Sequence, residues 1–483
     1  MPSNSLKSSA ASGIFWSAAE KFSVQAGQTV IFIVLARLLM PEDFGLIGML
    51  AIFIAASQTF VDSGMDQGLV QKQNRTGADY STVFVFNFLV SLGLYCLLFV
   101  TAPLIADFYD QPQLVSLTRI LTINLVVNSL AMVQRSKLII DLNFKSLARV
   151  NFVSVIISGM VGVACAYSEL GVWSLVIQNL VRSSMSVIMF WTATSWKPSI
   201  AFSKKSFDQL FGFGSKLLLA SLYAQTFNNI YTIVIGRAYT AADLGFYDRA
   251  KQFAELSAGT VGSILNQATF PILASLQHDQ KRMVSAYSRL IRMTAFVIFP
   301  TMTLLSLLAE PLVLLLLTEK WLPAVALLQL MCFARIFYPI SALNMNILNV
   351  TGRSDLFLKV DLSKLPLVVL ALVITIPLGV KAMVVGHVVT SFIAFFINAF
   401  LPGRLYGYGA IKQLKDMLPF IVSTILMAGM VFLFISMFES LVMKLVVGGV
   451  SGPVTYLLVS WLMGVRELDE VKEIVLNFLK RKK

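Results

Sequence analysis

Charged residues are scarce in this chain. Asp, Glu, Lys and Arg make up 13% of its 483 residues, whereas hydrophobic residues make up 57% and the mean hydropathy is +0.78. A soluble globular domain carries roughly 25% charged residues. Because so little polar surface could not face water on all sides, the composition excludes an ordinary soluble domain. It predicts an all-α polytopic membrane protein.

Residues that bind metals or attack substrates are also rare. The two histidines, His278 and His387, lack ligand spacing, and no phosphate-binding loop of the GxxxxGK[ST] type is present. We expect Cys96, Cys165 and Cys332 to be core thiols inside membrane spans rather than a disulfide framework. No predicted loop is long enough to fold by itself. The sequence thus predicts no metal, no cofactor and no catalysis, and favours a transporter or channel driven by ions or by a substrate gradient.

Long apolar runs are abundant. A membrane-spanning helix needs about 20 mainly apolar residues, and hydropathy predicts about fourteen such spans, with twelve or thirteen left open because some carry charges. The predicted spans are 14–37, 43–63, 82–106, 113–134, 150–169, 171–192, 212–236, 242–272, 287–309, 321–348, 357–379, 382–402, 416–438 and 443–464.

The placement of Lys and Arg predicts the orientation of these spans. With the N-terminus inside, cytoplasmic segments and their flanks hold 26 of the 38 basic residues, and outer segments hold seven. This asymmetry predicts an even number of spans with both termini cytoplasmic. We interpret the net charge of +13 as topology and contact with anionic membrane lipid rather than nucleic-acid binding, because the charges are spread over many short loops. The apolar run after Lys7 is expected to be a retained first helix and not a signal peptide.

Two stretches of similar sequence lie 200 residues apart. ARLLMPEDFG (36–45) and GRAYTAADLG (236–245) share Arg, Asp and Gly at their second, eighth and tenth positions, and each follows an apolar run. At the same offset, Asp66-Gln67 aligns with Asn266-Gln267. Three identities in ten residues can arise by chance, but their shared position relative to the spans favours an internal duplication.

Two copies with six spans each would have the same orientation in the membrane and would be related by an axis along its normal. We therefore expect an N-terminal lobe over 1–195, a C-terminal lobe over 206–404, and two further helices with a basic cytoplasmic tail over 412–483. Asp43 and Asp243 are predicted N-caps of the second and eighth helices. Arg37 and Arg237 are predicted interfacial anchors at the outer side.

Five segments, in this order, carry a resemblance to a known family: ARLLMPEDFGLIGM (36–49), QRSKLIIDLNFKSLARV (134–150), LGFYDRAKQFAELSAG (244–259), FPILASLQ (270–277) and NVTGRSDLFLK (349–359). The chain resembles the polysaccharide flippases of the multidrug/oligosaccharidyl-lipid/polysaccharide exporter superfamily, in the exopolysaccharide, teichuronic- or colanic-acid exporter branch. The resemblance spans about 1–400. It implies two six-helix lobes around a central cavity that opens alternately to each side of the bacterial cytoplasmic membrane. It further implies flipping of an undecaprenyl-pyrophosphate-linked oligosaccharide, in functional association with glycosyltransferases and a polymerase.

Such a cargo must carry a diphosphate and a glycan across about 30 Å of hydrocarbon. Because an unshielded charge there is costly, cations should face a wet cavity from the spans. The predicted substrate-binding residues are Lys21, Lys216, Arg249, Lys251 and Arg182. Lys21 and Lys216 could instead snorkel to headgroups, and Arg182 could form an ion pair within its lobe.

Glu20 and Glu255 are candidates for proton or sodium coupling, by analogy with ion-driven relatives of the family. A simpler interpretation of Glu255 is an i,i+4 pair with Lys251 on one helix face.

Two other functions remain open at this point. A multidrug or metabolite antiporter of the same superfamily would favour inward-facing carboxylates, whereas the charges in these spans lean basic. A membrane polymerase or ligase would need a large outer loop, which the sequence lacks.

Overall fold

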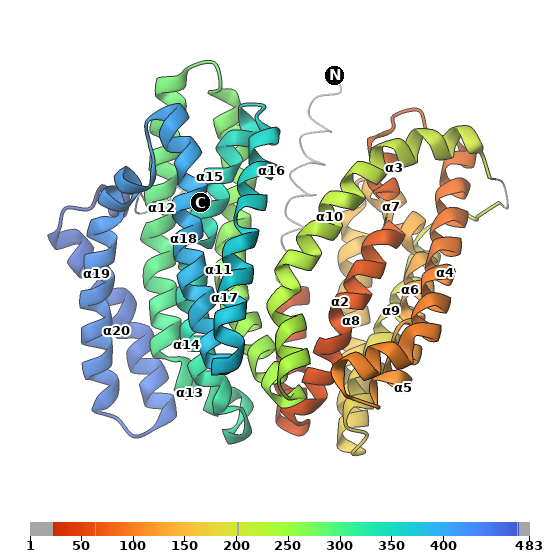
Figure 1. Cartoon of the computed structure of the whole chain (residues 1–483), viewed down its shortest axis with the longest axis horizontal. Coiled ribbons are helices and arrows are strands. Elements are labelled where there is room, and N and C mark those ends of the chain that lie inside the picture. Colours follow the sequence, from red (N-terminus) through yellow and green to blue (C-terminus); the bar gives the residue numbers. More distant parts are fainter. Residues whose placement is uncertain (1–22, 63, 200–201, 471, 473–483) are drawn as a thin grey trace, which may run out of the picture. The chain divides into compact units, whose positions relative to one another are not determined.

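The computed structural model describes residues 23–62, 64–199, 202–470 and 472, and within them the secondary structure is helical, without strands. The all-α prediction is confirmed. The chain forms two compact units, 1–245 and 246–483. Each is described by itself below, and both are drawn in Figure 1.

The first unit contains the helices coloured red to yellow-green in Figure 1. Their bounds are Ser23–Leu38, α2 Pro41–Asp62, α3 Met65–Gln71, α4 Gly77–Tyr109, α5 Leu114–Leu121, α6 Ile123–Ser129, α7 Met132–Ile140, α8 Phe144–Tyr167, α9 Val172–Ala193 and α10 Lys204–Ala238. α8 and α9 pack against each other along their length, and α10 packs against α2, α3 and α4.

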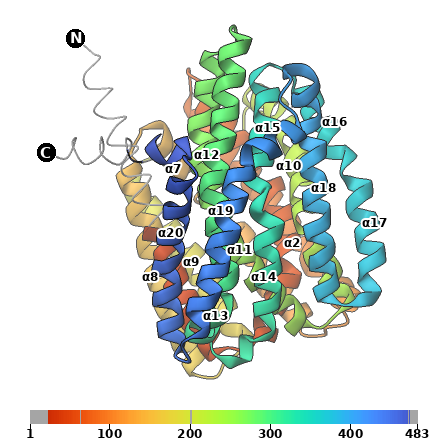
Figure 2. The same ribbon diagram turned by 90° about the vertical axis from the view of Figure 1, so that its left-hand side faces the viewer.

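Helix α11, Ala241–Ser275, begins in the first unit and continues into the second. The remaining helices of the second unit are α12 Gln280–Leu307, α13 Ala309–Leu317, α14 Pro323–Ile336, α15 Tyr338–Val350, α16 Ser354–Ser363, α17 Leu365–Thr375, α18 Val380–Tyr406, α19 Ala410–Ser436 and α20 Leu441–Leu462, with 3₁₀ turns at Glu319–Trp321 and Ile376–Leu378. Figure 2 shows α19 and α20 side by side, and both contact α12.

Ten helical stretches of the described chain are long and apolar enough to cross a membrane. They bear exposed apolar side chains such as Val100 and Leu104 on α4, which suits contact with lipid tails. The chain is thus a multi-pass membrane protein. The expected count of fourteen spans is not confirmed: α10 and α11 are not among the ten, and the stretch 357–379 is divided at Lys364 into α16 and α17.

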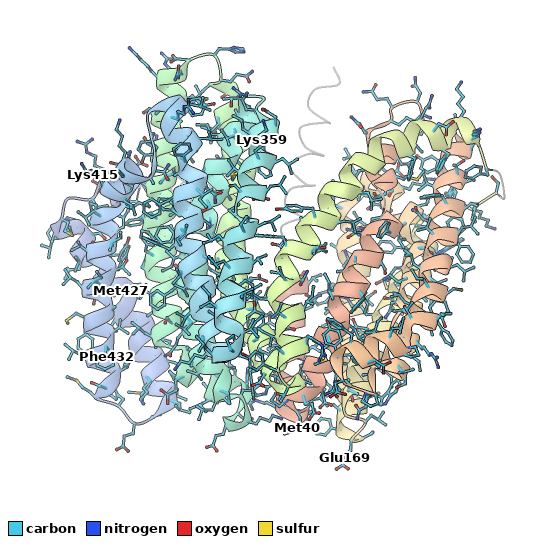
Figure 3. All side chains as sticks on the ribbon, in the orientation of Figure 1. Met40, Glu169, Lys359, Lys415, Met427 and Phe432 are labelled. Carbon is cyan, nitrogen blue, oxygen red and sulfur yellow. The ribbon has the colours of Figure 1, made fainter. Side chains whose placement is uncertain are left out.

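The ends of the helices agree with alternation across a membrane. Met40 at the start of α2 and Glu169 in the turn between α8 and α9 lie at the same end of the first unit (Figure 3). Lys359 on α16 and Lys415 on α19 likewise share one end of the second unit (Figure 3). Both lysines lie in segments that the sequence predicted to be cytoplasmic, and that orientation stays a prediction.

Asp43 and Asp243 do not occupy the N-cap positions that the sequence predicted. α2 begins at Pro41 and α11 at Ala241, so each aspartate is the third helical residue. Asp243 completes a capping box, because its Oδ2 accepts from the backbone N–H of Thr240 at 3.2 Å while Thr240 Oγ1 accepts from the Asp243 N–H at 3.1 Å. Asp43 Oδ2 accepts from the N–H of Met40 at 2.9 Å. Both aspartates therefore still accept hydrogen bonds from backbone N–H groups at the start of the helix, but they lie three residues after the N-cap position.

The segment that precedes α10 is held against α4 by hydrogen bonds and aromatic contacts. Ser81 and Ser199 share a hydrogen bond at 2.9 Å between their hydroxyls, and the N–H of Ser203 donates to Thr82 Oγ1 at 3.0 Å. The indole of Trp196 packs against the rings of Tyr80 and Phe84. These contacts explain why α10 packs with α2–α4. Whether the predicted lobe boundary at 195–206 marks the two copies stays a prediction.

A buried polar network joins α19 to the rest of the second unit. Gln413 Nε2 donates to Asn344 Oδ1 at 2.8 Å, and Asn344 Nδ2 donates back to Gln413 Oε1 at 3.2 Å. The hydroxyl of Tyr287 also bonds to both amides. Because Tyr287, Asn344 and Gln413 are fully buried and mutually satisfied, they specify how α12, α15 and α19 pack.

The cysteines are free thiols. Cys332 is buried as expected, whereas Cys96 is exposed on α4, so the prediction of a core position is wrong for that residue. Its neighbours on the same helix are exposed apolar residues, which places Cys96 on the lipid-facing side.

Candidate functional site

The first unit contains a cavity of about 1230 Å³. A smaller cavity of about 360 Å³ adjoins it and shares five of its lining residues: Thr59, Asp62, Asp66, Gln67 and Gln225. The walls come from α2, α3, α5, α6, α7, α8, α9 and α10 together with Val24 on the first described helix. Within a bundle of apolar helices, a polar space of this size is the best candidate for a binding site.

Helix α9 presents a polar face to this cavity. Asn179, Arg182, Ser183 and Ser186 line it, followed by Phe190. Their spacing of i, i+3, i+4 and i+7 places them on one side of a helix, which is why one wall of the cavity is continuous and polar. Asn179 is held in place by its own helix, because Nδ2 donates to the carbonyl of Leu175 at 2.8 Å.

Arg182 is the central cation of that face. The side-chain oxygen of Gln28 faces the guanidinium of Arg182. Gln28 Oε1 accepts a hydrogen bond from Arg182 Nη2 at 2.6 Å and one from Nη1 at 2.8 Å. Among the residues that the structure describes, no carboxylate lies within ion-pair distance of Arg182. The predicted ion pair within the lobe is therefore not seen in this part of the chain, and the positive charge faces the cavity with a neutral partner.

Two carboxylates lie in another part of the same cavity. Asp62 ends α2 and Asp66 lies in the first turn of α3. Gly64 between them has φ 67°, a left-handed conformation that glycine adopts without strain, and this turn brings both carboxylates to the cavity. Asp62 Oδ1 accepts from Gln58 Nε2 at 2.8 Å. Arg135 on α7 also lines the cavity and lies within electrostatic range of both carboxylates.

The matching positions of the predicted repeat lack these acids. At the offset of 200 residues, Asp62 corresponds to Gly262 and Asp66 to Asn266. The two carboxylates therefore have no acidic counterpart at the offset of the predicted repeat.

Side-chain amides supply the rest of the polar wall. Asn124 and Asn128 are one turn apart on α6, and Asn151 reaches the cavity from α8. Asn124 is 7% exposed, and its buried Oδ1 accepts no hydrogen bond from any described residue. A buried acceptor without a partner costs free energy, so a hydrogen-bond donor from a ligand would relieve that cost.

The structure brings only one predicted substrate-binding residue, Arg182, to this cavity. Glu20 and Lys21 lie outside the described residues. Lys216 lies on α10, but its side chain is also outside the described part of the chain.

Arg249, Lys251 and Glu255 lie on α11 in the second unit and line neither cavity. Arg249 Nη1 donates a hydrogen bond to Gln252 Oε1. Glu255 forms an ion pair with Arg335 on α14, whose guanidinium also lies 5.5 Å from the ring centroid of Tyr338. The pair with Arg335 takes the place of the i,i+4 pair with Lys251 that the sequence offered as the simpler interpretation.

Several lining residues were not singled out from the sequence. Arg135 entered only the count of cytoplasmic cations and a family segment, Asp66 entered only the repeat comparison, and Asp62 was not singled out, because hydropathy places the two aspartates near the end of a span. The polar face of α9 was visible in principle, since 179, 182, 183 and 186 follow a helical period inside an apolar stretch.

Comparison with known proteins shows what the chain is similar to. The sequence profile of a family described as "Polysaccharide biosynthesis protein" matches residues 34–326. The teichuronic acid biosynthesis protein TuaB of Bacillus subtilis (strain 168) is 26% identical over 394 residues, covering 81% of each chain. The lipopolysaccharide biosynthesis protein WzxC of Escherichia coli (strain K12) is 24% identical over 403 residues, covering 82% of this chain and 80% of WzxC.

Among solved structures, the lipid II flippase MurJ in an inward closed conformation has the same fold. The TM-score is 0.72 at 17% identity, and the alignment covers 93% of this chain and 98% of MurJ.

Proposed function

The chain belongs to the family of polysaccharide biosynthesis proteins, and from this membership we propose that it is an alternating-access flippase. Its cargo would be an undecaprenyl-pyrophosphate-linked oligosaccharide that moves from the inner to the outer leaflet of the bacterial cytoplasmic membrane during surface polysaccharide biosynthesis. Both termini would be cytoplasmic. The chain would act as a transporter that makes and breaks no covalent bond.

The observation that carries this proposal is a polar cavity with an arginine at its wall, inside a bundle of membrane-spanning helices. A glycan is rich in hydroxyl groups and cannot cross hydrocarbon unless protein groups replace its hydration. Asn, Gln and Ser side chains offer both donors and acceptors for that purpose. A glycan hydroxyl would also supply the donor that the buried Oδ1 of Asn124 lacks among the described residues.

The lipid tail needs no polar protein groups around it, because it is as apolar as the bilayer. The polar headgroup would therefore enter protein while the tail stays in lipid. In this proposal five cations contact the diphosphate or the glycan: Lys21, Lys216, Arg249, Lys251 and Arg182. Glu20 and Glu255 couple transport to protons or sodium. Glycosyltransferases supply the cargo and a polymerase consumes it.

A cation antiporter of the same superfamily is the second candidate. The carboxylates of Asp62 and Asp66 in the cavity favour it, since a cationic drug would bind there. Arg182 and Arg135 in the same cavity oppose it, because each repels a cation.

Translocation in proteoliposomes tests the proposal. Purified protein is reconstituted with a short-chain lipid-linked oligosaccharide, and the glycan that becomes accessible to an external sugar-cleaving enzyme is measured over time. We expect transfer by the wild-type chain and a reduced rate for Arg182→Gln. The matched control is Arg119→Gln, because Arg119 lies 4.5 Å from the ring centroid of Phe99 and does not line the cavity. Export of a cationic dye without any movement of the oligosaccharide would support the antiporter instead.

Ion coupling is tested in the same vesicles. Imposed proton and sodium gradients should change the rate, and the dependence should be lost in Glu20→Gln or Glu255→Gln. A rate indifferent to both gradients would remove these carboxylates as coupling residues.

A further inference from the structure

The second unit contains an ion pair that links two of its helices. Glu255 on α11 accepts a hydrogen bond from Arg335 Nη2 on α14, and the two residues are 80 positions apart in the chain. Among the described residues, no other carboxylate lies within ion-pair distance of Arg335. The position of α11 against α14 therefore depends in part on the charge of Glu255.

The two partners of this ion pair differ in their exposure. The side chain of Arg335 is 15% exposed, whereas that of Glu255 is 44% exposed. The Nε of Arg335 is buried and donates no hydrogen bond to any described residue. A largely buried cation that loses its partner is costly, but an exposed carboxylate can be solvated. Water and protons can thus reach Glu255, and the cost of breaking the pair falls mainly on Arg335.

Arg335 also lies beside an interruption in its membrane span. The helices α14 and α15 together form the apolar stretch Pro323–Val350, and Arg335 belongs to the last turn of α14. Pro339 has no N–H, so it cannot donate to the carbonyl of Arg335 four residues earlier. Helices bend at such gaps in their hydrogen bonding. A change in what holds Arg335 therefore acts at the junction of α14 and α15.

The charged neighbours of the pair indicate which cation Glu255 can bind. Lys251 lies one turn before Glu255 on α11, and His387 on α18 is within electrostatic range of Lys251 and Arg335. Asp248 lies two turns before Glu255, about 10 Å along the helix axis, which is too far to share an ion with it. A hard cation such as sodium needs several oxygen ligands, and Lys251 and Arg335 offer only N–H donors. A proton needs the carboxylate alone.

We propose that Arg335 is the positioning residue of the coupling carboxylate Glu255, and that a proton binding to Glu255 displaces Arg335 and frees the junction of α14 and α15. In this step a carboxylate oxygen of Glu255 gains the proton and becomes neutral, the guanidinium keeps its charge, and no other bond changes. Arg335 then remains beside Lys251 and His387 without its counter-charge. The inference rests on the proposed function, since it describes how an ion bound at Glu255 acts on the helices.

The test measures the pH dependence of transfer in proteoliposomes with the same pH on both sides. The probe is a short-chain lipid-linked oligosaccharide, and its initial rate of transfer is followed between about pH 4.5 and pH 9, which brackets the titration of glutamate. The wild-type rate should depend on pH in this range. The rate of Glu255→Gln should not.

Arg335→Gln should move the pH of half-maximal rate upward by about 1–3 units, because the lost guanidinium no longer favours the charged carboxylate. Arg335→Lys keeps the positive charge and should retain most of the wild-type profile. The double variant Glu255→Gln/Arg335→Gln should have the pH profile of Glu255→Gln alone, because Arg335 acts through the carboxylate.

Two further variants control for folding. Arg353→Gln removes an arginine from an exposed pair with Asp355 in the same unit, and its pH profile should equal that of the wild type. Glu255→Asp keeps both charges but shortens the reach of the carboxylate, so its profile should move in the same direction as that of Arg335→Gln. It provides the answer if Arg335→Gln does not fold, which thermal unfolding midpoints detect.

A lower unfolding midpoint of Arg335→Gln with a wild-type pH profile would overturn the proposal, because Arg335 would then only stabilise the fold. A double variant that differs in pH profile from Glu255→Gln would also contradict it. A wild-type rate that responds to sodium and not to pH would refute the proton step and leave the flippase function standing. Absence of any transfer by the wild-type chain would instead contradict the proposed function, and the coupling step would fall with it.

Discussion

Gly45 on α2 and Gly245 on α11 allow the two helices to approach each other closely, because each glycine contacts the first residue of the other helix. A Cβ atom on Gly45 would overlap the backbone carbonyl of Ala241, and one on Gly245 would overlap the carbonyl of Pro41. The two glycines are 200 residues apart and end the two similar stretches of the sequence. The contact is therefore reciprocal within the first unit: each of the two similar stretches packs on the other through its final glycine.

Gly45→Ala and Gly245→Ala should each destabilise the protein by about 1–3 kcal/mol, because a backbone atom cannot rotate away from the added methyl group. The measurement is the thermal unfolding midpoint of purified protein in detergent. Gly93→Ala on α4 is the control, since nothing lies within 4 Å of a Cβ atom there. An alanine at position 45 that is as stable as the one at position 93 would refute the close contact.

Arg249→Ala and Lys251→Ala should reduce surface polysaccharide without loss of protein from the membrane. The expected loss is about tenfold or more, if each cation makes a charged hydrogen bond to cargo. Polymer yield and membrane protein level are measured in a deletion strain that carries each variant. Lys381→Ala, at an exposed position, serves as the control. Normal polymer in both variants would remove Arg249 and Lys251 from the cargo path.

Glu467→Gln should destabilise the second unit. Glu467 Oε1 accepts from Arg292 Nε at 2.7 Å, and its side chain is only 8% exposed. A hydrogen bond between charged groups is worth about 1.5–3 kcal/mol when partly buried, and Asp416 at 3.6 Å from Arg292 replaces it only in part. Denaturant unfolding measures the effect.

Asp469→Asn provides the comparison for Glu467→Gln. Asp469 and Lys472 form an exposed pair, for which a change of about 0–1 kcal/mol is expected. Similar losses in the two variants would show that Glu467 acts as a surface residue.

Tyr408 should make the protein sensitive to alkaline pH. Burial raises the pKa of Tyr408, and its hydrogen bond to the Asp416 carboxylate, 2.8 Å between the two oxygens, raises it further. Because the folded state keeps the proton longer than the unfolded state, this contribution is present below about pH 10 and is lost as the pH rises above it.

The measurement is the unfolding midpoint as a function of pH for the wild-type chain and for Tyr408→Phe. The variant should be less stable at neutral pH by about 1 kcal/mol, because it lacks the hydrogen bond. The difference between the two proteins should shrink above about pH 10. Parallel curves across that range would contradict the raised pKa.

Hydropathy predicted the fold class well, because apolar runs of membrane length leave few alternatives. It did not predict the breaks. The predicted span 113–134 is divided into α5, α6 and the start of α7, with ends at Leu121 and Ser129 that no proline or glycine marks. Such breaks depend on packing within the unit, which periodicity does not contain.

The candidate site was predicted in part. Arg182 was predicted because a charge inside an apolar span is costly unless a cavity or an ion pair compensates it. Asp62, Asp66 and Arg135 were missed because their proximity depends on the left-handed turn at Gly64 and on the position of α7 against α3, which are tertiary features. From the sequence alone, a charged residue near the end of a span is assigned to the membrane interface, and only the tertiary structure shows that it lines a cavity.

The one-sided placement of these acids has an evolutionary consequence. At the predicted offset of 200 residues, Gly262 and Asn266 stand opposite Asp62 and Asp66, so the acidic pair has no counterpart there. Selection for a new surface sugar would then act on the first half of the chain more than on the second. Lineages that diverge in their coat polysaccharide should therefore accumulate substitutions around the first-half cavity faster than at the matching positions of the second half.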